Sequence, residues 1–241
     1  MGTRKQQPRV ANKKTAEKAA RRQARESEKE QNLRQPLELE WRTEAQAQAW
    51  DLLQRSLLTF LLGSAGSGKT FLAMAYAINA VLTGQAEKIV LTRPIVEAGE
   101  KLGYLPGTFG EKVNPYMQPL YDAMDVLVGK QSAKREVINK AVVLAPLCYM
   151  RGRTFTNSVC VFDEAQNATL PQLKLFLTRF GDGCRFIVTG DPTQSDLPFP
   201  SPLVREVVTK LAGAKDIGAI TFADDDVVRH PIVKTVLARL G

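Results

Sequence analysis

Histidine and cysteine are scarce in this sequence, and long apolar runs are missing. Among 241 residues there is one histidine, His230, and three widely spaced cysteines, Cys148, Cys160 and Cys184, with no C-x-x-C pair. We therefore expect neither a structural zinc site nor a disulfide framework, but reduced and mostly buried thiols. No run of about 18 apolar residues occurs, and the basic N-terminus lacks the apolar core of a secretory signal. These absences predict a cytoplasmic protein with no membrane partner.

Acidic residues are also few at the N-terminus, where positive charge is concentrated. The chain has a net charge of +8, and residues 1–36 carry eleven Lys and Arg against four Glu, a net of 11 − 4 = +7. A segment with so few apolar side chains cannot offset the entropy lost on folding, so we expect residues 1–36 to be a disordered basic arm. The arm either attracts nucleic-acid phosphates or acts as a solubilising tail, and its charge alone favours neither.

Residues 37–241 alternate apolar strands with helices, which predicts a single α/β domain. Apolar runs typical of buried strands occur at 57–62, 88–92, 158–162, 185–189 and 217–222. Helical spacing of apolar residues marks 43–53, 68–82, 170–179 and 202–211. Turn residues predict loops and helices over 95–140, a further strand is a candidate at 141–145, and Pro231 suits the first turn of a last helix. Strands that are apolar on both sides imply a mostly parallel sheet with helices on both faces.

One glycine-rich segment fits the phosphate-binding pattern G-x-x-x-x-G-K-[ST]. This phosphate loop comprises Gly63, Ser64, Ala65, Gly66, Ser67, Gly68, Lys69 and Thr70. It follows a predicted strand and opens a predicted helix, which is the context that such a loop requires. The glycines let backbone N–H groups approach phosphates at the positive end of the helix dipole. Lys69 adds a cation for the β- and γ-phosphates and Thr70 a hydroxyl for Mg²⁺, so we predict ATP and Mg²⁺ as cofactors.

Two other predicted strands end in polar groups that should face the same crevice. The strand at 158–162 runs into Asp163, which would hold Mg²⁺ through its water shell, and Glu164, which would polarise the attacking water. Such an acidic pair is often only a helix cap, but the phosphate loop upstream favours the catalytic interpretation. The polar run 190–194 suits a type I turn, and from there Gln194 would orient the water or sense the γ-phosphate.

Together these motifs resemble the first RecA-like domain of superfamily 1 helicases and, more narrowly, the PhoH family of PhoH-like phosphate-starvation ATPases. The resemblance covers about residues 40–241. Besides the phosphate loop it rests on Thr43-Glu44-Ala45-Gln46, Thr92-Arg93-Pro94, Leu102-Gly103-Tyr104-Leu105-Pro106-Gly107, Tyr149-Met150-Arg151-Gly152-Arg153-Thr154, Asp163-Glu164-Ala165-Gln166-Asn167, Gly190-Asp191-Pro192-Thr193-Gln194 and Asp226-Val227-Val228-Arg229-His230-Pro231.

The resemblance implies roles for residues outside the phosphate loop. Gln46 would hydrogen-bond the adenine edge, and Arg229 would act as an arginine finger, although without the resemblance it would be interpreted as a surface arginine. Because PhoH-like proteins are similar to ring-forming ATPases, the finger would come from a neighbouring subunit, and we expect a hexameric ring.

Three other arginines, Arg93, Arg151 and Arg153, are candidates for contacts with the phosphates of single-stranded nucleic acid. Tyr104, Tyr149 or Phe155 could stack bases, although core packing is favoured for Phe155 and stays open for Tyr149.

The leading functional hypothesis is an ATPase that acts on RNA or single-stranded nucleic acid, as a helicase or translocase. Superfamily 1 helicases have two RecA-like domains whereas this chain has one, so a ring of subunits would supply the second wall of each ATP site. One alternative is an ATP-gated nucleic-acid-binding switch that does not unwind. The other is a small-molecule kinase, against which Glu164 argues, because a carboxylate directly after Asp163 suits activation of water.

Overall fold

The computed structural model describes residues 17–18, 21–25, 27–28, 32–94, 109–194, 203–227, 232 and 239. The chain divides into two compact units, Met1–Gln35 and Pro36–Gly241. The described residues of the first unit are mostly helical and exposed. The disorder expected of the basic arm in isolation stays a prediction.

In the described part of the second unit, six strands form one parallel sheet. They are β1 (Leu58–Leu62), β2 (Lys88–Thr92), β3 (Val142–Leu144), β4 (Ser158–Phe162), β5 (Arg185–Gly190) and β6 (Ile217–Thr221). Their order is β3-β2-β4-β5-β1-β6, and each neighbouring pair is parallel. Because all the strands point the same way, their carboxyl ends form one edge of the sheet. At this edge β5 separates β1, which leads into the phosphate loop, from β4, which leads into the acidic pair.

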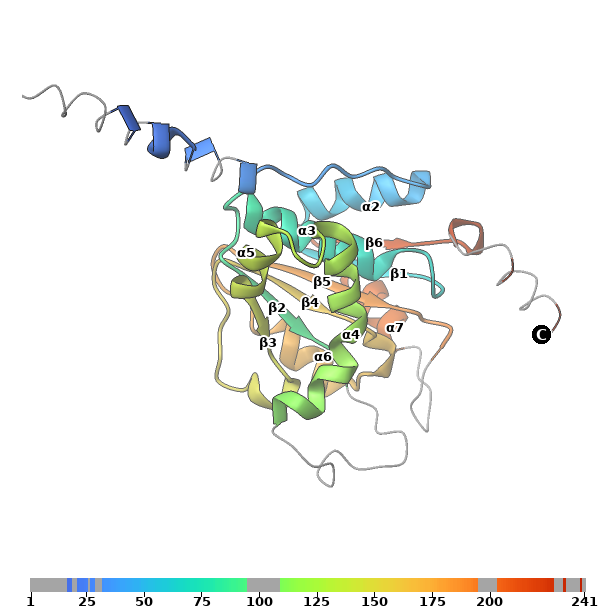
Figure 1. Cartoon of the computed structure of the whole chain (residues 1–241). Helices are drawn as coiled ribbons and strands as arrows, with labels where there is room; N and C mark the ends of the chain where they lie inside the picture. The colour runs from blue at the N-terminus through green and yellow to red at the C-terminus, as the bar shows by residue number, and fades with distance from the viewer. Residues whose placement is uncertain are drawn as a thin grey trace, which may run out of the picture. The chain divides into compact units, whose positions relative to one another are not determined.

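Helices cover both faces of the sheet (Figure 1). One face carries α2 (Glu44–Arg55), α3 (Lys69–Leu82), α4 (Phe109–Val128) and α5 (Ala133–Ala141). The other carries α6 (Leu170–Leu177) and α7 (Leu203–Leu211) with the short 3₁₀ turns η2 (Leu147–Tyr149) and η3 (Ala165–Asn167). A further 3₁₀ turn, η4 (Asp224–Asp226), follows β6. The predicted arrangement of a parallel sheet between two helical layers is confirmed.

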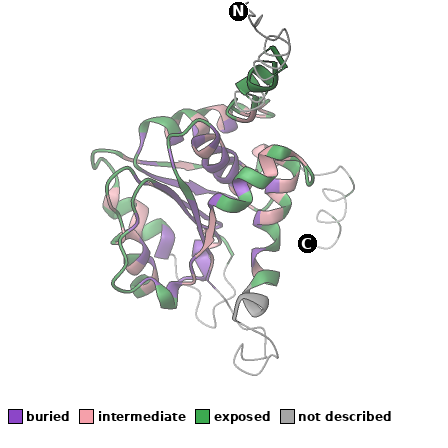
Figure 2. Ribbon diagram, turned by 60° about the vertical axis from the view of Figure 1, so that its left-hand side comes forward, coloured by how far each residue is buried: buried purple, intermediate pink, exposed green. Residues whose placement is uncertain are grey.

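Alternation along the strands divides the core into two clusters. Leu61 and Val161 pack on the α3 side of the sheet, whereas their neighbours Phe60 and Cys160 pack on the α6 side. The central strands β1, β4 and β5 are therefore buried on both faces (Figure 2), as their continuous apolar runs predicted, whereas β3 and β6 at the sheet edges are partly exposed.

The cysteines are free and mostly buried, as expected: Cys160 and Cys184 are buried, and Cys148 is exposed. Burial raises the pKa of the Cys160 thiol, which keeps it protonated and unreactive.

Local sequence accounts for most helix boundaries, and α4 is the exception. Thr43 caps α2, since its hydroxyl accepts a hydrogen bond from the backbone N–H of Gln46 at 3.3 Å. Helix α4 runs for 20 residues although it contains Pro115 and Pro119, which lack the backbone N–H that an α-helix uses. Nothing in the sequence predicted so long a helix across two prolines. No helix in the described ranges is both long and apolar enough to cross a lipid bilayer.

Candidate nucleotide-binding and catalytic site

The phosphate loop connects the carboxyl end of β1 to the first turn of α3. Its glycines Gly63, Gly66 and Gly68 have φ angles of 141°, 87° and 90°, a region of backbone space that favours glycine. Gly63 is also tightly packed, because a Cβ atom there would lie 2.9 Å from both Cβ and the carbonyl oxygen of Phe222. The loop therefore needs glycine at its start both for its conformation and for its contact with the chain that follows β6.

Lys69 is buried at the start of α3, and its side chain folds back over the phosphate loop. The ammonium Nζ donates to the carbonyl oxygen of Ser64 at 2.8 Å and to Oγ of Ser67 at 3.4 Å. These contacts hold one positive charge over the phosphate loop, next to the N-terminus of α3. A phosphate group seated there would meet the ammonium, loop amides and the helix dipole together.

The phosphate loop borders a cavity of about 290 Å³. Lys69 and Thr70 line it from the loop, Asp163 and Glu164 from the end of β4, and Gln194 from the turn after β5. Three segments that are far apart in the sequence thus meet at one edge of the sheet. The structure brings together the five residues that the motifs indicated for phosphate, metal and water.

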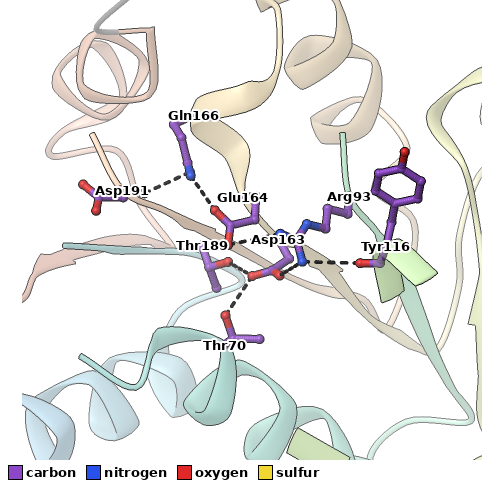
Figure 3. Close-up of polar contacts among 8 residues, drawn as sticks. All are labelled: Thr70, Arg93, Tyr116, Asp163, Glu164, Gln166, Thr189 and Asp191. Atoms are coloured by element: carbon purple, nitrogen blue, oxygen red, sulfur yellow. Dashed lines mark hydrogen bonds and ion pairs between the residues drawn. The ribbon is translucent and has the colours of Figure 1, made fainter. Parts of the chain in front are cut away.

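Asp163 is almost fully buried at the end of β4. Its Oδ1 accepts hydrogen bonds from the hydroxyls of Thr70, at 2.9 Å, and Thr189 (Figure 3). Its backbone N–H donates to the carbonyl of Thr92. A carboxylate and a hydroxyl in contact provide the hard oxygen ligands that Mg²⁺ prefers. The residues present therefore fit the ion that the motif implies.

Glu164 adopts an unusual backbone conformation for a residue with a side chain. Its φ of 55° and ψ of 46° are left-handed, and the chain turns there from β4 into η3. Both carboxylate oxygens have partners: Oε1 lies 3.4 Å from Nη2 of Arg93, and Oε2 accepts a short hydrogen bond from Gln166. Two neighbours therefore contact the carboxylate that is expected to act on water, Gln166 by a short hydrogen bond and Arg93 at a longer distance.

Gln166 is a site residue that sequence reasoning did not assign. It is buried, its Nε2 donates to Glu164, and its Oε1 accepts from the backbone N–H of Asp191 at 2.9 Å (Figure 3). The side chain thus links the ends of β4 and β5. The sequence placed it within the segment 163–167, but its bridging role depends on the pairing of two strands that the sequence does not show.

The polar run after β5 forms the predicted turn. The carboxylate of Asp191 accepts from the backbone N–H of Thr193 at 2.9 Å and from its hydroxyl at 2.6 Å, and the N–H of Gln194 donates to the Asp191 carbonyl at 3.3 Å. This turn directs Gln194 to the cavity. Its role at the γ-phosphate stays a prediction.

The three arginines predicted to contact nucleic acid lie in different places. Arg93 is beside the acidic pair, with Nη1 at 3.7 Å from Oδ2 of Asp163. Arg151 and Arg153 are exposed in the stretch after η2, outside the cavity lining, and the Arg153 guanidinium lies 5.2 Å from the ring centre of Phe155. Phe155 itself is buried, which confirms core packing, whereas Tyr149 is 57% exposed. Tyr104 and Arg229 lie outside the described residues.

Gln46, on α2, contacts the phosphate loop. Its Oε1 accepts from the backbone N–H of Arg42 at 3.0 Å, and its Nε2 donates to the carbonyl of Ser67 at 3.4 Å. A Cβ atom on Gly68 would lie 2.9 Å from this Nε2. The structure therefore shows a contact with the loop, and the predicted contact of Gln46 with adenine remains untested.

Comparison with known sequences gives a family match over most of the second unit. The family model described as PhoH-like protein matches residues 38–240. A PhoH-like protein of Mycobacterium leprae (strain TN) is 46% identical over 188 residues, which cover 78% of this chain and 54% of that protein. A PhoH-like protein of Bacillus subtilis (strain 168) is 45% identical over 192 residues, which cover 77% of this chain and 58% of that protein. The chain thus spans little more than half the length of these curated relatives.

Comparison with solved structures supports the fold. The large terminase of a thermophilic bacteriophage, in complex with ADP, matches with a TM-score of 0.54 over 83% of this chain and 50% of that chain. Sequence identity is only 13%, so this likeness bears on the fold alone. With the six-stranded parallel sheet, it confirms the predicted RecA-like P-loop fold. On the family match and the sequence identities, the chain belongs to the PhoH-like protein family.

Proposed function

We propose that this chain is a Mg²⁺-dependent ATPase that acts on RNA or single-stranded nucleic acid as a ring of subunits in the cytoplasm. The observation that carries the proposal is the meeting of Lys69, the acidic pair and Gln194 around one cavity. A phosphate-binding cation, a carboxylate for metal and a second carboxylate for water are the parts that ATP hydrolysis needs.

Each side chain has a distinct part in this reaction. Lys69 and the loop amides bind the β- and γ-phosphates, while Thr70 and Asp163 would hold Mg²⁺. The ion, when bound, neutralises charge on the phosphates. Glu164 orients water and accepts its proton, and Gln194 senses the γ-phosphate. The ADP named with the terminase supports an adenine nucleotide as the ligand.

Nucleic acid is proposed as the partner because of the positive charge of the chain and the resemblance of its motifs to those of helicases. The basic arm, with a net charge of +7 over residues 1–36, would add salt-sensitive affinity for any polyanion. Arg151 and Arg153 are exposed and add two guanidinium groups to the second unit. A ring is proposed because one RecA-like unit forms only one side of an ATP site. Arg229 of a neighbouring subunit would complete the other side of that site.

The test is phosphate release by the full chain with ATP and Mg²⁺, with and without single-stranded RNA. We expect turnover by the wild-type protein that stops when EDTA removes the metal. Lys69→Ala should lower turnover by at least about 100-fold, because the phosphates lose their cation. Glu164→Gln should bind ATP normally but hydrolyse it slowly.

Lys88→Ala is the matched control, since Lys88 is an exposed lysine at the start of β2, on the opposite edge of the sheet. Near-native turnover in Lys69→Ala would contradict the proposed grip on phosphate. Nucleotide-dependent RNA binding without any wild-type turnover would instead favour the ATP-gated switch.

A further inference from the structure

Arg93 lies where three segments of the chain meet. It directly follows β2, whose neighbour β4 leads into the acidic pair. Its guanidinium lies 3.4 Å from Glu164 Oε1 and 3.7 Å from Asp163 Oδ2, and it donates to the carbonyl of Tyr116 on α4 at 3.3 Å (Figure 3). One cation therefore connects the catalytic carboxylates to a helix on the face of the sheet that carries α3.

The contacts of Arg93 with the carboxylates are long, and the one with Glu164 is partly exposed to solvent whereas Asp163 is buried. Charge-assisted hydrogen bonds between N–H and carboxylate are typically about 2.7–2.9 Å long, shorter than both distances here. The side chains of Arg93 and Glu164 are 22% and 34% exposed, so water screens their attraction. The ion pair is therefore weak enough to exchange for another anion.

Glu164 has one firm partner and one exchangeable partner. Gln166, at Oε2, is buried and is itself anchored on the backbone of Asp191. Arg93, at Oε1, is 22% exposed and approaches that oxygen only to 3.4 Å. Departure of the guanidinium would free Oε1 while Gln166 kept the carboxylate in place.

The third contact of Arg93 is on a stretch of α4 that lacks some of its backbone hydrogen bonds. Tyr116 is between Pro115 and Pro119, and neither proline can donate the backbone hydrogen bond that braces a helix turn. A neutral carbonyl is also a weaker partner for arginine than an anion. A phosphate can accept two parallel hydrogen bonds from the guanidinium, whereas each carboxylate contacts it here through one oxygen.

We propose that Arg93 couples nucleic-acid binding to ATP hydrolysis by exchanging partners. Without nucleic acid it pairs with Glu164 and restrains turnover, and a backbone phosphate of single-stranded RNA takes the guanidinium and releases Glu164. The inference rests on the proposed function and explains how one arginine serves both the polymer and the ATP site. Glu164 and an RNA phosphate compete for the same guanidinium, so the two binding free energies are linked. Weakening the ion pair between Arg93 and Glu164 must therefore strengthen RNA binding.

The first experiment measures ATP turnover of the full chain with and without a 20-nucleotide oligouridine. Arg93→Ala should raise turnover without RNA by about 2- to 5-fold, since a partly exposed pair is lost, and should bring the stimulation ratio close to one. Arg93→Lys should fall between, because lysine keeps the charge but cannot bind in the bidentate manner. Arg55→Ala, an exposed arginine in the last turn of α2, is the charge-matched control.

Two results of this experiment would overturn the inference. One is wild-type stimulation by RNA in Arg93→Ala, and the other is lower turnover in that variant both with and without RNA. Thermal melting checks folding, and if Arg93→Ala does not fold, the same two results in Arg93→Lys decide.

The second experiment measures binding alone, by fluorescence anisotropy of labelled oligouridine without nucleotide. Glu164→Gln should bind more tightly than wild type by about 2- to 5-fold, and adding Arg93→Ala should remove the gain. Unchanged affinity in Glu164→Gln overturns the inference. If RNA does not stimulate wild-type turnover, the inference about Arg93 is overturned but the proposed ATPase activity is not. If the wild-type protein shows no turnover at all, the proposed function is overturned.

Discussion

Glu164 combines backbone strain with side-chain contacts on both of its carboxylate oxygens. A left-handed conformation costs a residue with a Cβ atom roughly 1–2 kcal/mol, and it persists only where the surroundings impose it. Here the surroundings are η3, whose Asn167 N–H donates to the Glu164 carbonyl at 3.0 Å, together with Arg93 and Gln166. The turn lets the Glu164 side chain line the cavity while the chain continues onto the face of the sheet that carries α6.

Removing the Gln166 side chain tests whether the direction of the Glu164 carboxylate matters. In Gln166→Ala we expect kcat to fall by about 10- to 100-fold, because a misdirected base loses proton-transfer geometry. ATP affinity should stay near the wild-type value, since the hydrogen bonds of Gln166 to Glu164 and Asp191 hold strand ends and not the phosphate loop. Steady-state kinetics and nucleotide titration separate the two effects.

The control for Gln166→Ala is Gln48→Ala, which removes an exposed glutamine that bonds to Glu44 one turn earlier in α2. An unchanged kcat in Gln166→Ala would show that Glu164 does not depend on this hydrogen bond. Loss of ATP binding as well would point to collapse of the cavity.

At the residue scale, local motifs predicted the charged groups but not their mutual contacts. Lys69, Asp163 and Glu164 could be found because their chemistry is tied to a fixed spacing and a strand end. The contact of Arg93 with Glu164 depends on the pairing of β2 with β4, and two helices and β3 separate these strands along the chain. The bridge made by Gln166 depends in the same way on the pairing of β4 with β5, so no local pattern could reveal it.

The contact between the phosphate loop and the chain after β6 is the element-scale feature that most restricts the site. Besides the close packing of Gly63 on Phe222, the hydroxyl of Ser64 donates to Oδ1 of Asp224 in η4 at 2.8 Å. The backbone N–H of Phe222 also donates to the carbonyl of Leu62 at 2.8 Å. The chain that follows β6 thus fixes the beginning of the phosphate loop.

Alanine at Gly63 measures the cost of crowding this contact. Gly63→Ala should lower the free energy of unfolding by about 2–4 kcal/mol, because it adds a steric clash to an unfavourable φ of +141°. Gly84→Ala is the control, since φ there is +74° but no atom lies within 4 Å of the added Cβ, and about 1 kcal/mol is expected. Urea denaturation compares them. Equal losses would mean that backbone strain, and not contact with Phe222, decides the effect.

At the element scale, strand positions were predicted to within one or two residues, whereas strand order was not. Continuous apolar runs mark a buried strand wherever it lies, so β1, β2, β4 and β5 follow directly from the sequence. The position of β5 between β1 and β4 depends on tertiary contacts, and no local sequence pattern indicates it. Helices were expected within 95–140, but the length of α4 was not, because Pro115 and Pro119 ordinarily end a helix, and here packing of Met117 and Leu120 in the core outweighs their cost.

At the scale of the whole molecule, the two units differ in character. The first carries most of the net charge and its described residues are largely exposed, whereas the second contains both apolar clusters. Composition predicted this difference, because the arm has almost no large apolar side chains with which to build a core. Assembly could not be predicted from composition, since a subunit interface depends on the shapes of two surfaces.

Mixing two inactive variants tests the proposed ring. If Arg229 acts on the ATP site of a neighbouring subunit, Arg229→Ala and Lys69→Ala subunits should together regain activity, up to about one quarter of wild type in an equal mixture. Each variant alone should be inactive, and remeasuring phosphate release after mixing gives the result. No recovery, at ratios where mass measurement shows mixed assemblies, would place the finger within its own subunit.

The pairing of β1 has a consequence for synthesis on the ribosome. Leu58–Leu62 is made early, but its two sheet neighbours begin only at Arg185 and Ile217. Until Arg185 has been synthesised this apolar strand has no native neighbour, and long-range parallel pairing forms slowly. The nucleotide pocket therefore cannot be completed before both neighbouring strands have been made, and until then the apolar strand is a site at which the nascent chain can aggregate.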